Sequence, residues 1–592
     1  MKFDLILVSY NSKKYIEKCF SSILKSDYNL KNIGIYIYDN NSSDNTIELL
    51  KNIKEKNKEK FSDFQIIASK KNLGFGIANN EASKLAKGDY LFFLNIDCEI
   101  YPDTLKKLEE TILEKGNNKV GIYELKQQIY EHPKYYDPIS LKTKWASGAC
   151  MIINRELFRK INGFDDNIFM YCEDVEISYR LRRLGYDILY LKDIPIIHYS
   201  YQEAYEFKKS QYVNATVNNL YLRFKYGRIK DIVKGYALYL LFYKDIINNP
   251  QIKKDEVLKI KQEVRKNKNK MVFKGIFEYI KRIRYLGSKN NVKFDFRGFD
   301  YSGVKDGPFY QIKKIDTNPL VSIIVRTCNR PQVLRETLIS LRNQTYKNIE
   351  IIVVEDGKDT TSKMLEEEFS DLNIKYLALG KNVGRCKAGN KGLEMATGKY
   401  LNFLDDDDLF YEDHVEVLVS ELEKSDYQVA YSTAFVTPIV VKSRDPYEYD
   451  LLDAYVLLSN EYNPLKLMYN NITPIQSVMF SREVYLNCGG FDPELDLLED
   501  WDLWIRYALK YPFKFVKKTT SIYRIPGDTK DASERAKDMD KYLNKVRSKY
   551  KDVKIQTTMG DAVDYFNYIV ALSTRPMVVR LDKIKYILKR KK

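Results

Sequence analysis

The order of hydrophobic and polar positions near the start of the chain returns after its midpoint. A mostly apolar run at residues 5–8 ends in polar turn residues, and a second run at 321–325 does the same. Each run is followed by apolar residues three or four positions apart, which is typical of one face of a helix. A further apolar run then follows in each half, at 35–38 and 351–354. The order strand, helix, strand predicts a parallel βαβ unit in each half.

The two halves also share blocks of sequence. Residues 71–97 recur at 381–407 in the same order and at a constant spacing, from an Asn-x-Gly turn to the acids that follow an apolar strand. A Gly-Phe-Asp block followed by Glu-Asp occurs at 163–174 and again at 490–500. A repeat of this length predicts two copies of one α/β fold and not one fold of double size.

Acidic residues close the second predicted strand of each copy. Asp39 ends this strand in the first copy, and Glu355 and Asp356 end it in the second. Ligands of parallel sheets bind where the carboxyl ends of the strands meet. The sequence therefore predicts a binding site at this edge of each sheet.

A run of four carboxylates, Asp405–Asp408, follows an apolar strand in the second copy. Carboxylates at the end of a buried strand lose hydration and repel one another, so we expect a cation beside them. An all-oxygen set of ligands favours Mg²⁺ or Mn²⁺ over zinc. The alternative, a helix N-cap with an acidic first turn, accounts for one or two of the four acids. The first copy carries a weaker form, Asn95 and Asp97, for which a cap or turn is a more serious alternative.

The composition limits the class of protein. Of the 592 residues, 44% are hydrophobic and 30% are charged, which is enough apolar mass for several packed cores and excludes a disordered polymer. The net charge of +16, with 48 tyrosines and 28 phenylalanines, predicts a surface that suits phosphates, anionic lipids or sugars. The seven cysteines form no CxxC pair, which argues against a zinc ribbon or a disulfide scaffold and favours a reducing cytoplasm.

The remaining segments bear on location. No apolar run approaches the roughly 20 residues of a membrane span, and the first residues have the pattern of a strand and not of a secretory signal. We therefore expect a cytoplasmic protein that is not an integral membrane protein. Residues 231–317 predict a helical connector, and residues 531–592 predict a helical region with a basic tail. The tail, 577–592, is expected either to lie on the inner face of the membrane or to remain solvated.

Taken in order, these motifs resemble glycosyltransferase family 2. The strand-end acids, the Asn-x-Gly turns at Asn72 and Asn382, the Phe-Leu-Asp-x-Asp-Asp run and the later Gly-Gly-Phe-Asp and Glu-Asp-Trp blocks carry the resemblance. It covers about residues 1–230 and 318–530. The resemblance implies two tandem GT-A domains, each an α/β fold with a mostly parallel sheet. It also implies transfer of a sugar, with inversion, from a nucleotide-diphosphate donor.

The resemblance assigns donor contacts by position. Asp39 and Glu355 would contact the base of the donor, with Asn40 and Asp356 beside it, near the ribose. Arg385, directly after the second Asn-x-Gly turn, would join the donor contacts of the second copy. Mg²⁺ or Mn²⁺ would bind the donor diphosphate through the aspartates of the following block.

The metal ligands that the resemblance implies differ between the copies. In the second copy they are Asp405 and Asp407. In the first copy the same positions hold Asn95 and Asp97, and His198 is expected to complete the site. The alternative for His198 is an ordinary buried or surface histidine.

The catalytic base that the resemblance implies is Asp174 in the first copy and Asp500 in the second. Displacement at an anomeric carbon needs a base within hydrogen-bond reach of the acceptor hydroxyl, and a cation to neutralise the departing diphosphate. Each aspartate follows a glutamate and precedes an amphipathic stretch, so an ordinary acidic helix start is the alternative. The two interpretations are compatible, since a catalytic carboxylate can begin a helix.

Departures from the family pattern indicate that the two donors differ. Asn95 together with Phe75 resembles the rhamnosyltransferase branch, whose donor is dTDP-rhamnose. Arg385 and the full acidic run resemble the general UDP-sugar type, although dTDP-rhamnose is also an option for this copy.

The leading hypothesis is a bifunctional glycosyltransferase of bacterial polysaccharide biosynthesis. It would add two sugars to a surface glycan, a lipid-linked precursor or a glycoprotein. In a variant of this hypothesis one copy is degenerate and serves acceptor binding or assembly. A nucleic-acid-binding protein or two-metal nuclease is a remote alternative, because no recognition motif for nucleic acid is evident. A non-catalytic scaffold at the membrane surface is a third class.

Overall fold

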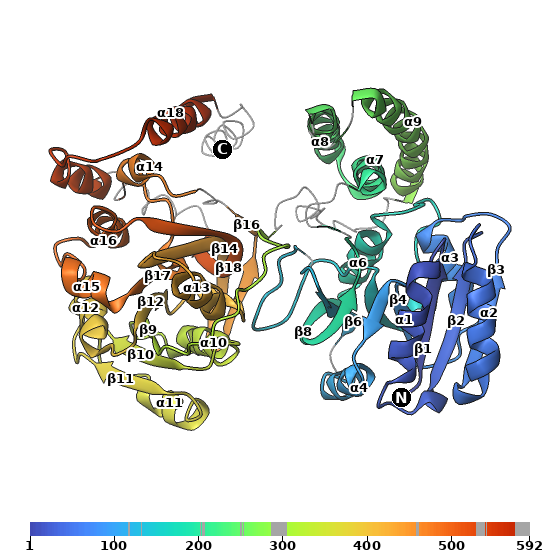
Figure 1. The fold of residues 1–592 in the computed structure, drawn as a ribbon, viewed down its shortest axis with the longest axis horizontal. Helices are drawn as coiled ribbons and strands as arrows, with labels where there is room; N and C mark the ends of the chain where they lie inside the picture. Colours follow the sequence, from blue (N-terminus) through green and yellow to red (C-terminus); the bar gives the residue numbers. More distant parts are fainter. Residues whose placement is uncertain are drawn as a thin grey trace. The chain divides into compact units, whose positions relative to one another are not determined.

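A computed structural model of the chain describes residues 1–116, 119–131, 133–201, 203, 208–248, 252, 254–285, 305–456, 461–527, 539 and 541–574. The chain divides into two compact units, Met1–Val304 and Lys305–Lys592, and Figure 1 draws both, coloured along the sequence. The predicted basic tail at 577–592 lies outside the described residues, as does the segment 286–304 of the predicted connector.

The described part of the first unit is built on an eight-stranded sheet with the order β3-β2-β1-β4-β7-β6-β8-β5. From β3 to β4 neighbouring strands are parallel, and beyond β4 the sheet is mixed. Along β1, Leu5 and Leu7 face one hydrophobic core and Ile6 faces another. The strands are β1 (Phe3–Ser9), β2 (Ile33–Asp39), β3 (Asp63–Ala68), β4 (Tyr90–Leu94), β5 (Cys98–Ile100), β6 (Val120–Gln128), β7 (Cys150–Asn154) and β8 (Asp187–His198).

Helices cover both faces of this sheet. α1 and α4 pack on one core, and α3, α5 and α6 pack on the other. α1 buries Ile16, Phe20 and Ile23, as the spacing of its apolar residues predicts. The helices are α1 (Lys13–Leu24), α2 (Thr46–Asn57), α3 (Phe75–Ser83), α4 (Thr104–Glu114), α5 (Arg155–Lys160) and α6 (Glu173–Arg183), with 3-10 turns η1 (Leu30–Asn32) and η2 (Lys58–Lys60).

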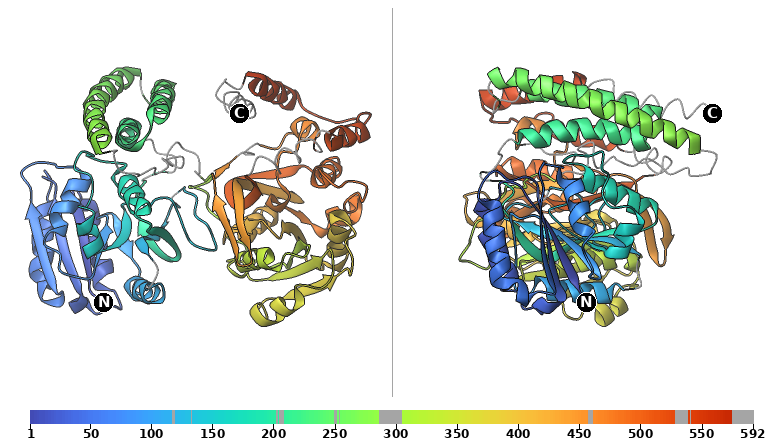
Figure 2. Two further views of the ribbon diagram at one scale, coloured as in Figure 1. Left: turned by 180° about the vertical axis from the view of Figure 1, so that it is seen from behind. Right: turned by 90° about the vertical axis from the view of Figure 1, so that its right-hand side faces the viewer.

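Longer helices follow the last strand of the first unit: α7 (Lys209–Tyr226), α8 (Ile229–Asn248) and α9 (Lys254–Tyr285). α7 and α9 share with α6 a core that includes Tyr179 and Val264. Figure 2 shows these helices on the side of the unit away from the N-terminus. The predicted connector therefore begins as helices that belong to the first unit. Among all the described helices, none is long and apolar enough to cross a membrane.

The second unit repeats the sheet of the first, strand for strand over the described ranges, in the order β11-β10-β9-β12-β17-β14-β18-β13. The strands from β11 to β12 are again parallel, and β15 and β16 pair with β14 outside the repeated path. The strands are β9 (Val321–Thr327), β10 (Ile349–Glu355), β11 (Ile374–Ala378), β12 (Tyr400–Asp405), β13 (Leu409–Phe410), β14 (Val429–Arg444), β15 (Tyr447–Leu451), β16 (Tyr455–Val456), β17 (Val478–Ser481) and β18 (Phe513–Pro526). The prediction of two tandem α/β domains is confirmed.

Helices of the second unit bury the residues that its periodicity singles out. α10 buries Leu334, Leu338 and Leu341 against the sheet, and α16 buries Trp501 and Trp504. The helices are α10 (Pro331–Arg342), α11 (Ser362–Glu368), α12 (Arg385–Met395), α13 (His414–Glu423), α14 (Pro464–Tyr469), α15 (Arg482–Cys488), α16 (Glu499–Ala508) and α18 (Met559–Thr574), with the 3-10 turn η4 (Ile475–Ser477).

Candidate active sites

Asp39 lies buried at the carboxyl end of β2 in the first unit. Ser9, at the end of the neighbouring strand, donates its hydroxyl to Asp39 Oδ2 at 2.8 Å. Ser42 donates both its backbone N–H, at 3.0 Å, and its hydroxyl, at 2.6 Å, to the same carboxylate. Neutral donors therefore fix this strand-end acid at the edge where the sequence places it. Its contact with the donor base stays a prediction.

Asn40 holds the Asn-x-Gly turn that precedes α3. Its side-chain oxygen accepts the N–H of Leu73 at 2.8 Å, and its amide nitrogen donates to the carbonyl of Gly74 at 2.9 Å. Gly74 has a φ of +86°, and a Cβ there would lie 2.1 Å from the carbonyl oxygen of Phe169. That carbonyl accepts the N–H of Phe75, the first residue of α3, at 2.8 Å. Glycine is thus required both by the backbone conformation and by the close approach of the loop before α6.

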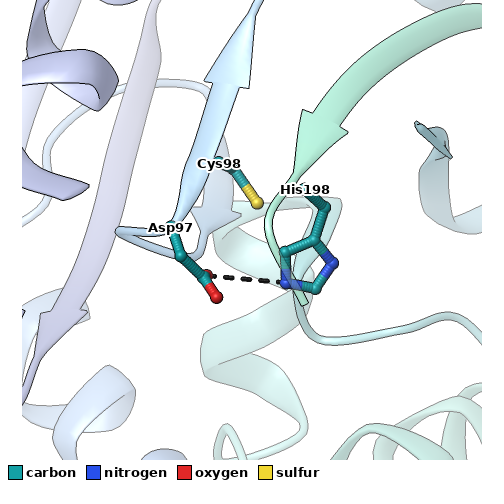
Figure 3. A group of neighbouring side chains, drawn as sticks. All are labelled: Asp97, Cys98 and His198. Carbon is teal, nitrogen blue, oxygen red and sulfur yellow. Dashed lines mark ion pairs between the residues drawn. The ribbon is translucent and has the colours of Figure 1, made fainter. Parts of the chain in front are cut away.

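Asp97 and His198 turn toward each other, with Cys98 beside them, as Figure 3 shows. Asp97 follows β4 and His198 ends β8, and His198 Nε2 lies 3.5 Å from Asp97 Oδ1. His198 Nδ1 lies 2.7 Å from the side-chain oxygen of Gln127. Because an amide oxygen only accepts hydrogen bonds, Nδ1 donates to Gln127, and Nε2 is the ring nitrogen that faces Asp97.

This arrangement fits a divalent cation. One ligand atom each from Asp97, Cys98 and His198 lie within 4.8 Å of one another, and the described residues form no other such group. Burial raises the pKa of the Cys98 thiol well above its usual value, which leaves the carboxylate and the imidazole as the better ligands. Burial acts to raise the pKa of Asp97 as well, but the adjacent His198, together with a backbone hydrogen bond and the charge of Lys208, holds that pKa below its ordinary value.

Asn95 anchors the loop that carries Asp97. Its backbone N–H donates to the carbonyl of Ala149 at 2.9 Å, and its own carbonyl accepts the N–H of Cys98 at 3.1 Å. Its half-buried side chain is an uncharged amide, so Asp97 supplies the charge of this pair of positions.

Asp174 is the second residue of α6 and is half-buried. It accepts the N–H of Gly148 at 3.1 Å and that of Val175 at 2.8 Å. Burial raises the pKa of Asp174 even though these bonds oppose the shift. Glu173 has its pKa raised well above the usual value by burial and by the charge of Asp174. A carboxylate with a raised pKa at this position suits a general base.

In the second unit the same edge of the sheet borders a cavity of about 930 Å³. It gathers most of the residues that the sequence singled out in this copy. Those that line it are Asp356, Arg385, Asp405, Asp407 and Asp500. Glu355 is the member of the predicted set that does not line it.

Glu355 ends β10 as Asp39 ends β2, and it is fully buried. Its carboxylate accepts the N–H of Thr360 at 3.1 Å and the hydroxyl of the same residue. The hydroxyl of Tyr376 also donates to it, at 2.5 Å. Neutral groups of the protein thus already donate hydrogen bonds to this carboxylate. The contact of Glu355 with the base of the nucleotide sugar stays a prediction.

Asp356 holds the second Asn-x-Gly turn. Its two carboxylate oxygens accept the N–H of Val383 at 2.6 Å and that of Gly384 at 3.0 Å. Asn40 makes the equivalent clamp in the first unit. The sequence did not reveal this role of both residues in holding the turn. Their place near the ribose stays a prediction.

Arg326 is the main partner of Asp405. It lies on β9 opposite Asp405 in the parallel pairing with β12. It donates two hydrogen bonds to Asp405, at 2.8 and 2.9 Å, and a third to Glu499 at 3.2 Å. Burial acts to raise the pKa of Asp405, but Arg326, together with the charges of Arg385 and Arg330, holds that pKa below the usual value. A charged residue inside the otherwise uncharged strand at 321–327 is the signal by which the sequence could have indicated this partner.

The other acids of the run have partners of their own. Arg330 donates to both oxygens of Asp406, and its Nη1 lies 3.3 Å from Asp407 Oδ2. Asp408 accepts the N–H of Arg524 at 2.9 Å. Burial raises the pKa of Asp406 to about 7 and that of Asp408 well above its usual value. Asp407 is the most exposed of the four, with 38% of its side-chain surface accessible.

These contacts bear on the metal ligands predicted for the second unit. Both oxygens of Asp405 accept from Arg326, so a cation bound at Asp405 would lie beside the positive charge of a guanidinium. The role of Asp405 as a metal ligand stays a prediction, made for a carboxylate that already has a cationic partner. Asp407 keeps an accessible carboxylate and stays a predicted ligand.

Asp500 is the second residue of α16, as Asp174 is of α6. It accepts the side-chain N–H of Asn471 at 2.8 Å and the backbone N–H of Trp501 at 2.8 Å. Burial and the charge of Glu499 raise its pKa to about 7. A general base works best when its pKa is close to the operating pH. Asn471 was not predicted, because nothing in the sequence links its loop to this helix.

Comparison with known families places both units in one group of enzymes. The family model described as glycosyl transferase family 2 matches residues 4–178 and 322–484, which together are more than half of the chain. Each match begins in the first strand of a unit. The first match includes Asp174, whereas the second ends before Asp500.

Individual relatives are distant. A Rickettsia felis protein described as an uncharacterized glycosyltransferase is 24% identical over 448 residues, which are 73% of this chain and 65% of the relative. A Haemophilus influenzae protein with the same description is 30% identical over 286 residues, 45% of this chain and 87% of the relative. The chain thus spans less than two thirds of the Rickettsia relative. Among solved structures, the mannosyltransferase PcManGT from Pyrobaculum calidifontis, in complex with GDP-Man and Mn²⁺, is 15% identical, with a TM-score of 0.32 over 48% of this chain and 87% of that one.

Proposed function

The chain belongs to glycosyltransferase family 2, and from that premise we propose that each unit transfers a sugar, with inversion, from a nucleotide-diphosphate donor. The proposed acceptor is a bacterial surface glycan, a lipid-linked precursor or a glycoprotein. The observation that carries the proposal is Asp500, a carboxylate with a pKa of about 7 in the wall of a cavity of about 930 Å³. Asp174 holds the same place at the start of α6.

Asp174 and Asp500 are the proposed general bases. The carboxylate takes the proton of the acceptor hydroxyl while that oxygen bonds to the anomeric carbon, and the nucleotide diphosphate leaves from the opposite face of the sugar. In the second unit, Asn471 and the N–H of Trp501 orient the carboxylate without supplying a formal positive charge. Asp500 therefore keeps the raised pKa that proton transfer near neutral pH requires.

Positive charge is needed where the diphosphate leaves. In the first unit, Asp97 and His198 would hold Mg²⁺ or Mn²⁺, which when bound neutralises the negative charge of the leaving group. In the second unit, Arg330 and Arg385 line the cavity and have N–H groups that suit phosphate oxygens. Arg385 exposes 51% of its side chain, so a donor can reach it.

The proposed donors differ between the units. Asn95 and Phe75 support dTDP-rhamnose as the donor of the first unit. Arg385 and the acidic run Asp405–Asp408 support a UDP-sugar for the second unit, with dTDP-rhamnose as the other option. Asp39 and Glu355 are the proposed contacts to the donor base. The proposed location is the cytoplasm, with residues 577–592, outside the described part of the chain, as the segment that contacts the inner face of the membrane.

Nucleotide release from dTDP- and UDP-sugars tests the proposal. The assay compares the full chain with Asp174→Asn and Asp500→Asn, in Mn²⁺ or Mg²⁺, with and without a glycan acceptor. We expect each variant to lose release from a different donor by at least about a hundredfold, because proton transfer contributes roughly that much or more. Asp552→Asn, a substitution of an exposed aspartate that does not line the cavity, is the matched control.

The outcomes separate the readings of the chain. If one variant alone reduces release, the other unit is degenerate and serves acceptor binding or assembly. If the unaltered chain releases no nucleotide and binds no donor, the enzymatic proposal is wrong.

A further inference from the structure

We propose that Arg326 and Asp405 form a permanent ion pair, so that Asp405 is not the metal ligand that the sequence indicates. Arg326 also positions the catalytic base by binding Glu499. This role rests on the proposed function, since it lies within the donor site of that reaction. It adds a positioning residue, Arg326, and it removes Asp405 from the metal ligands of the second unit.

The duplicated fold contains a second version of this pair. β9 and β12 run in parallel so that Arg326 lies opposite Asp405. β1 and β4 pair in the same register in the first unit. When this register is extended to the end of β1, Val8 lies opposite Asn95. One unit thus has a cation with a carboxylate, and the other has an apolar side chain with an amide. Neither pair carries a net charge.

Arg326 is firmly held. Its side chain is 6% exposed and lies 5.9 and 5.2 Å from the ring centroids of Phe403 and Phe491. Its N–H groups donate twice to Asp405 and once to Glu499. A buried guanidinium that lost these acceptors would keep its charge without a partner, which is strongly unfavourable. A metal ion that took the place of Arg326 at Asp405 would impose that cost.

The second acceptor of Arg326 links the pair to the catalytic base. Glu499 Oε1 lies 3.2 Å from Arg326 Nη1 and 3.8 Å from Arg385 Nη1. Asp500 is the next residue, in the first turn of α16. One guanidinium therefore fixes both the acid at the end of β12 and the start of the helix that carries the base.

In the first unit the matching glutamate has no such partner among the described residues. Val8 and Phe75 occupy the positions of Arg326 and Arg385. Glu173 there has a buried Oε2 without a hydrogen-bond partner, and burial raises its pKa well above the usual value. Burial thus favours the neutral form of Glu173, which needs no cation. The second unit thus pairs its glutamate with Arg326, and the described part of the first unit has no arginine beside a glutamate that favours its neutral form. In both units the glutamate before the base adds no unpaired charge.

The second unit also lacks the imidazole of the first. β5 and β8 pair Cys98 with His198, and β13 and β18 pair Leu409 with Ile522. Asp408 is the counterpart of Cys98 in the repeat, and the pairing continued by one residue brings Asp408 opposite Tyr523. Tyr523 therefore falls where His198 lies, and it lines the cavity. Of the predicted metal ligands in the second unit, this leaves Asp407 as the carboxylate that a cation arriving with the donor can reach.

A double-mutant cycle tests the ion pair without any donor. Arg326→Val and Asp405→Asn together copy the residues of the first unit into the second. We expect each single change to lower the melting temperature of the second unit more than the double change does, because each leaves a buried charge without its partner. If the two effects simply add, the residues do not form the proposed pair.

Manganese dependence separates an ion pair from a metal ligand. The assay uses the full chain with Asp174→Asn, so that only the second unit turns over, and measures nucleotide release at increasing Mn²⁺. In the Arg326→Val/Asp405→Asn variant we expect a half-saturating Mn²⁺ concentration within about threefold of the parent, and in Asp407→Asn one at least about tenfold higher. Release that needs no metal in the parent also supports the ion pair. A rise of about tenfold or more in the double variant would identify Asp405 as a metal ligand and overturn the proposal.

The positioning role has its own signature. Arg326→Val alone should lower kcat more than it raises the donor KM, and should move the acid limb of the pH profile to higher pH, because a cation near Asp500 is lost. The double variant should keep the same loss of kcat and the same shift of the pH profile, because Glu499 lacks Arg326 there as well. A change in KM alone, with no shift of the pH profile, would contradict this role. If no donor turns over and Asp500→Asn has no effect, the proposed function fails, while the melting cycle still decides the pair.

Discussion

His198 Nε2 lies 3.5 Å from Asp97 Oδ1, at the point where the end of β8 meets the loop after β4. The side-chain oxygen of Gln127 accepts from the other ring nitrogen of His198 and so turns Nε2 toward the carboxylate. A carboxylate oxygen and an imidazole nitrogen at this distance are two ligand atoms that one divalent cation could share.

Loss of either ligand should weaken metal binding in the first unit. In a chain with Asp500→Asn, so that the first unit alone turns over, His198→Gln should raise the half-saturating Mn²⁺ concentration about tenfold, and Asp97→Asn about a hundredfold, because the carboxylate supplies the charge. Titration of nucleotide release with Mn²⁺ measures both. Asp103→Asn, which removes an exposed carboxylate just beyond this loop, is the control and should leave the titration unchanged. An equal effect of the control would mean that net charge, and not ligation, sets the response.

Turnover in the second unit should depend on pH through Asp500. Its pKa of about 7 in the folded protein is well above the value of about 3.9 for an aspartate in an unfolded chain. Because the base acts as a carboxylate, kcat/KM should rise with pH up to about 7 and fall about tenfold per unit below it. A profile measured with Asp174→Asn in the background, flat from pH 5 to 8, would exclude Asp500 as the base.

The same shift has the opposite consequence for stability. A carboxyl group whose folded pKa is raised stabilises the fold fully below its unfolded pKa, and this stabilisation is lost as pH rises through its folded pKa. Asp500→Asn should therefore raise the melting temperature of the second unit at pH 8, and less so at pH 5. Thermal unfolding at the two pH values checks this, with Asp552→Asn as the exposed control.

The paired turn glycines separate steric clash from backbone strain. Gly74 and Gly384 have φ of +86° and +96°, but a Cβ at Gly74 would meet the Phe169 carbonyl at 2.1 Å, whereas one at Gly384 meets nothing within 4 Å. Gly384→Ala should lower stability by about 1–2 kcal/mol from the left-handed backbone alone. Gly74→Ala should cost more, because the loop before α6 must move, and should also reduce turnover of the first unit. Equal losses of stability would contradict the clash.

The glutamates before the two bases should respond differently to neutralisation. Burial raises the pKa of Glu173 and favours its neutral form, so Glu173→Gln should change turnover of the first unit by less than about threefold. Glu499 is hydrogen-bonded to Arg326, so Glu499→Gln should reduce kcat of the second unit by at least about tenfold. Each is measured with the base of the other unit replaced by asparagine. Similar losses in both would mean that Glu173 is ionised.

Much of the fold could be predicted from the sequence because its signals are local. The repeated order of apolar runs and turns identified two α/β units, and the spacing of Ile16, Phe20 and Ile23 identified the buried face of a helix. Acids that follow apolar strands indicated the carboxyl edge of each sheet, where Asp39 and Glu355 lie. These features depend on the period of a strand or helix, which the chain carries over a few residues.

Only the tertiary structure decided which charged and polar side chains become neighbours. Arg326 and Asp405 lie far apart along the chain and become neighbours because β9 pairs in parallel with β12, a strand that does not follow it directly. The same applies to Gln127 and His198, which β6 and β8 bring together. The sequence determined that acids gather at the edge of each sheet. Strand order and register determined that one of them is held by a guanidinium and another faces an imidazole, because ion pairing depends on distance in space and not on spacing along the chain.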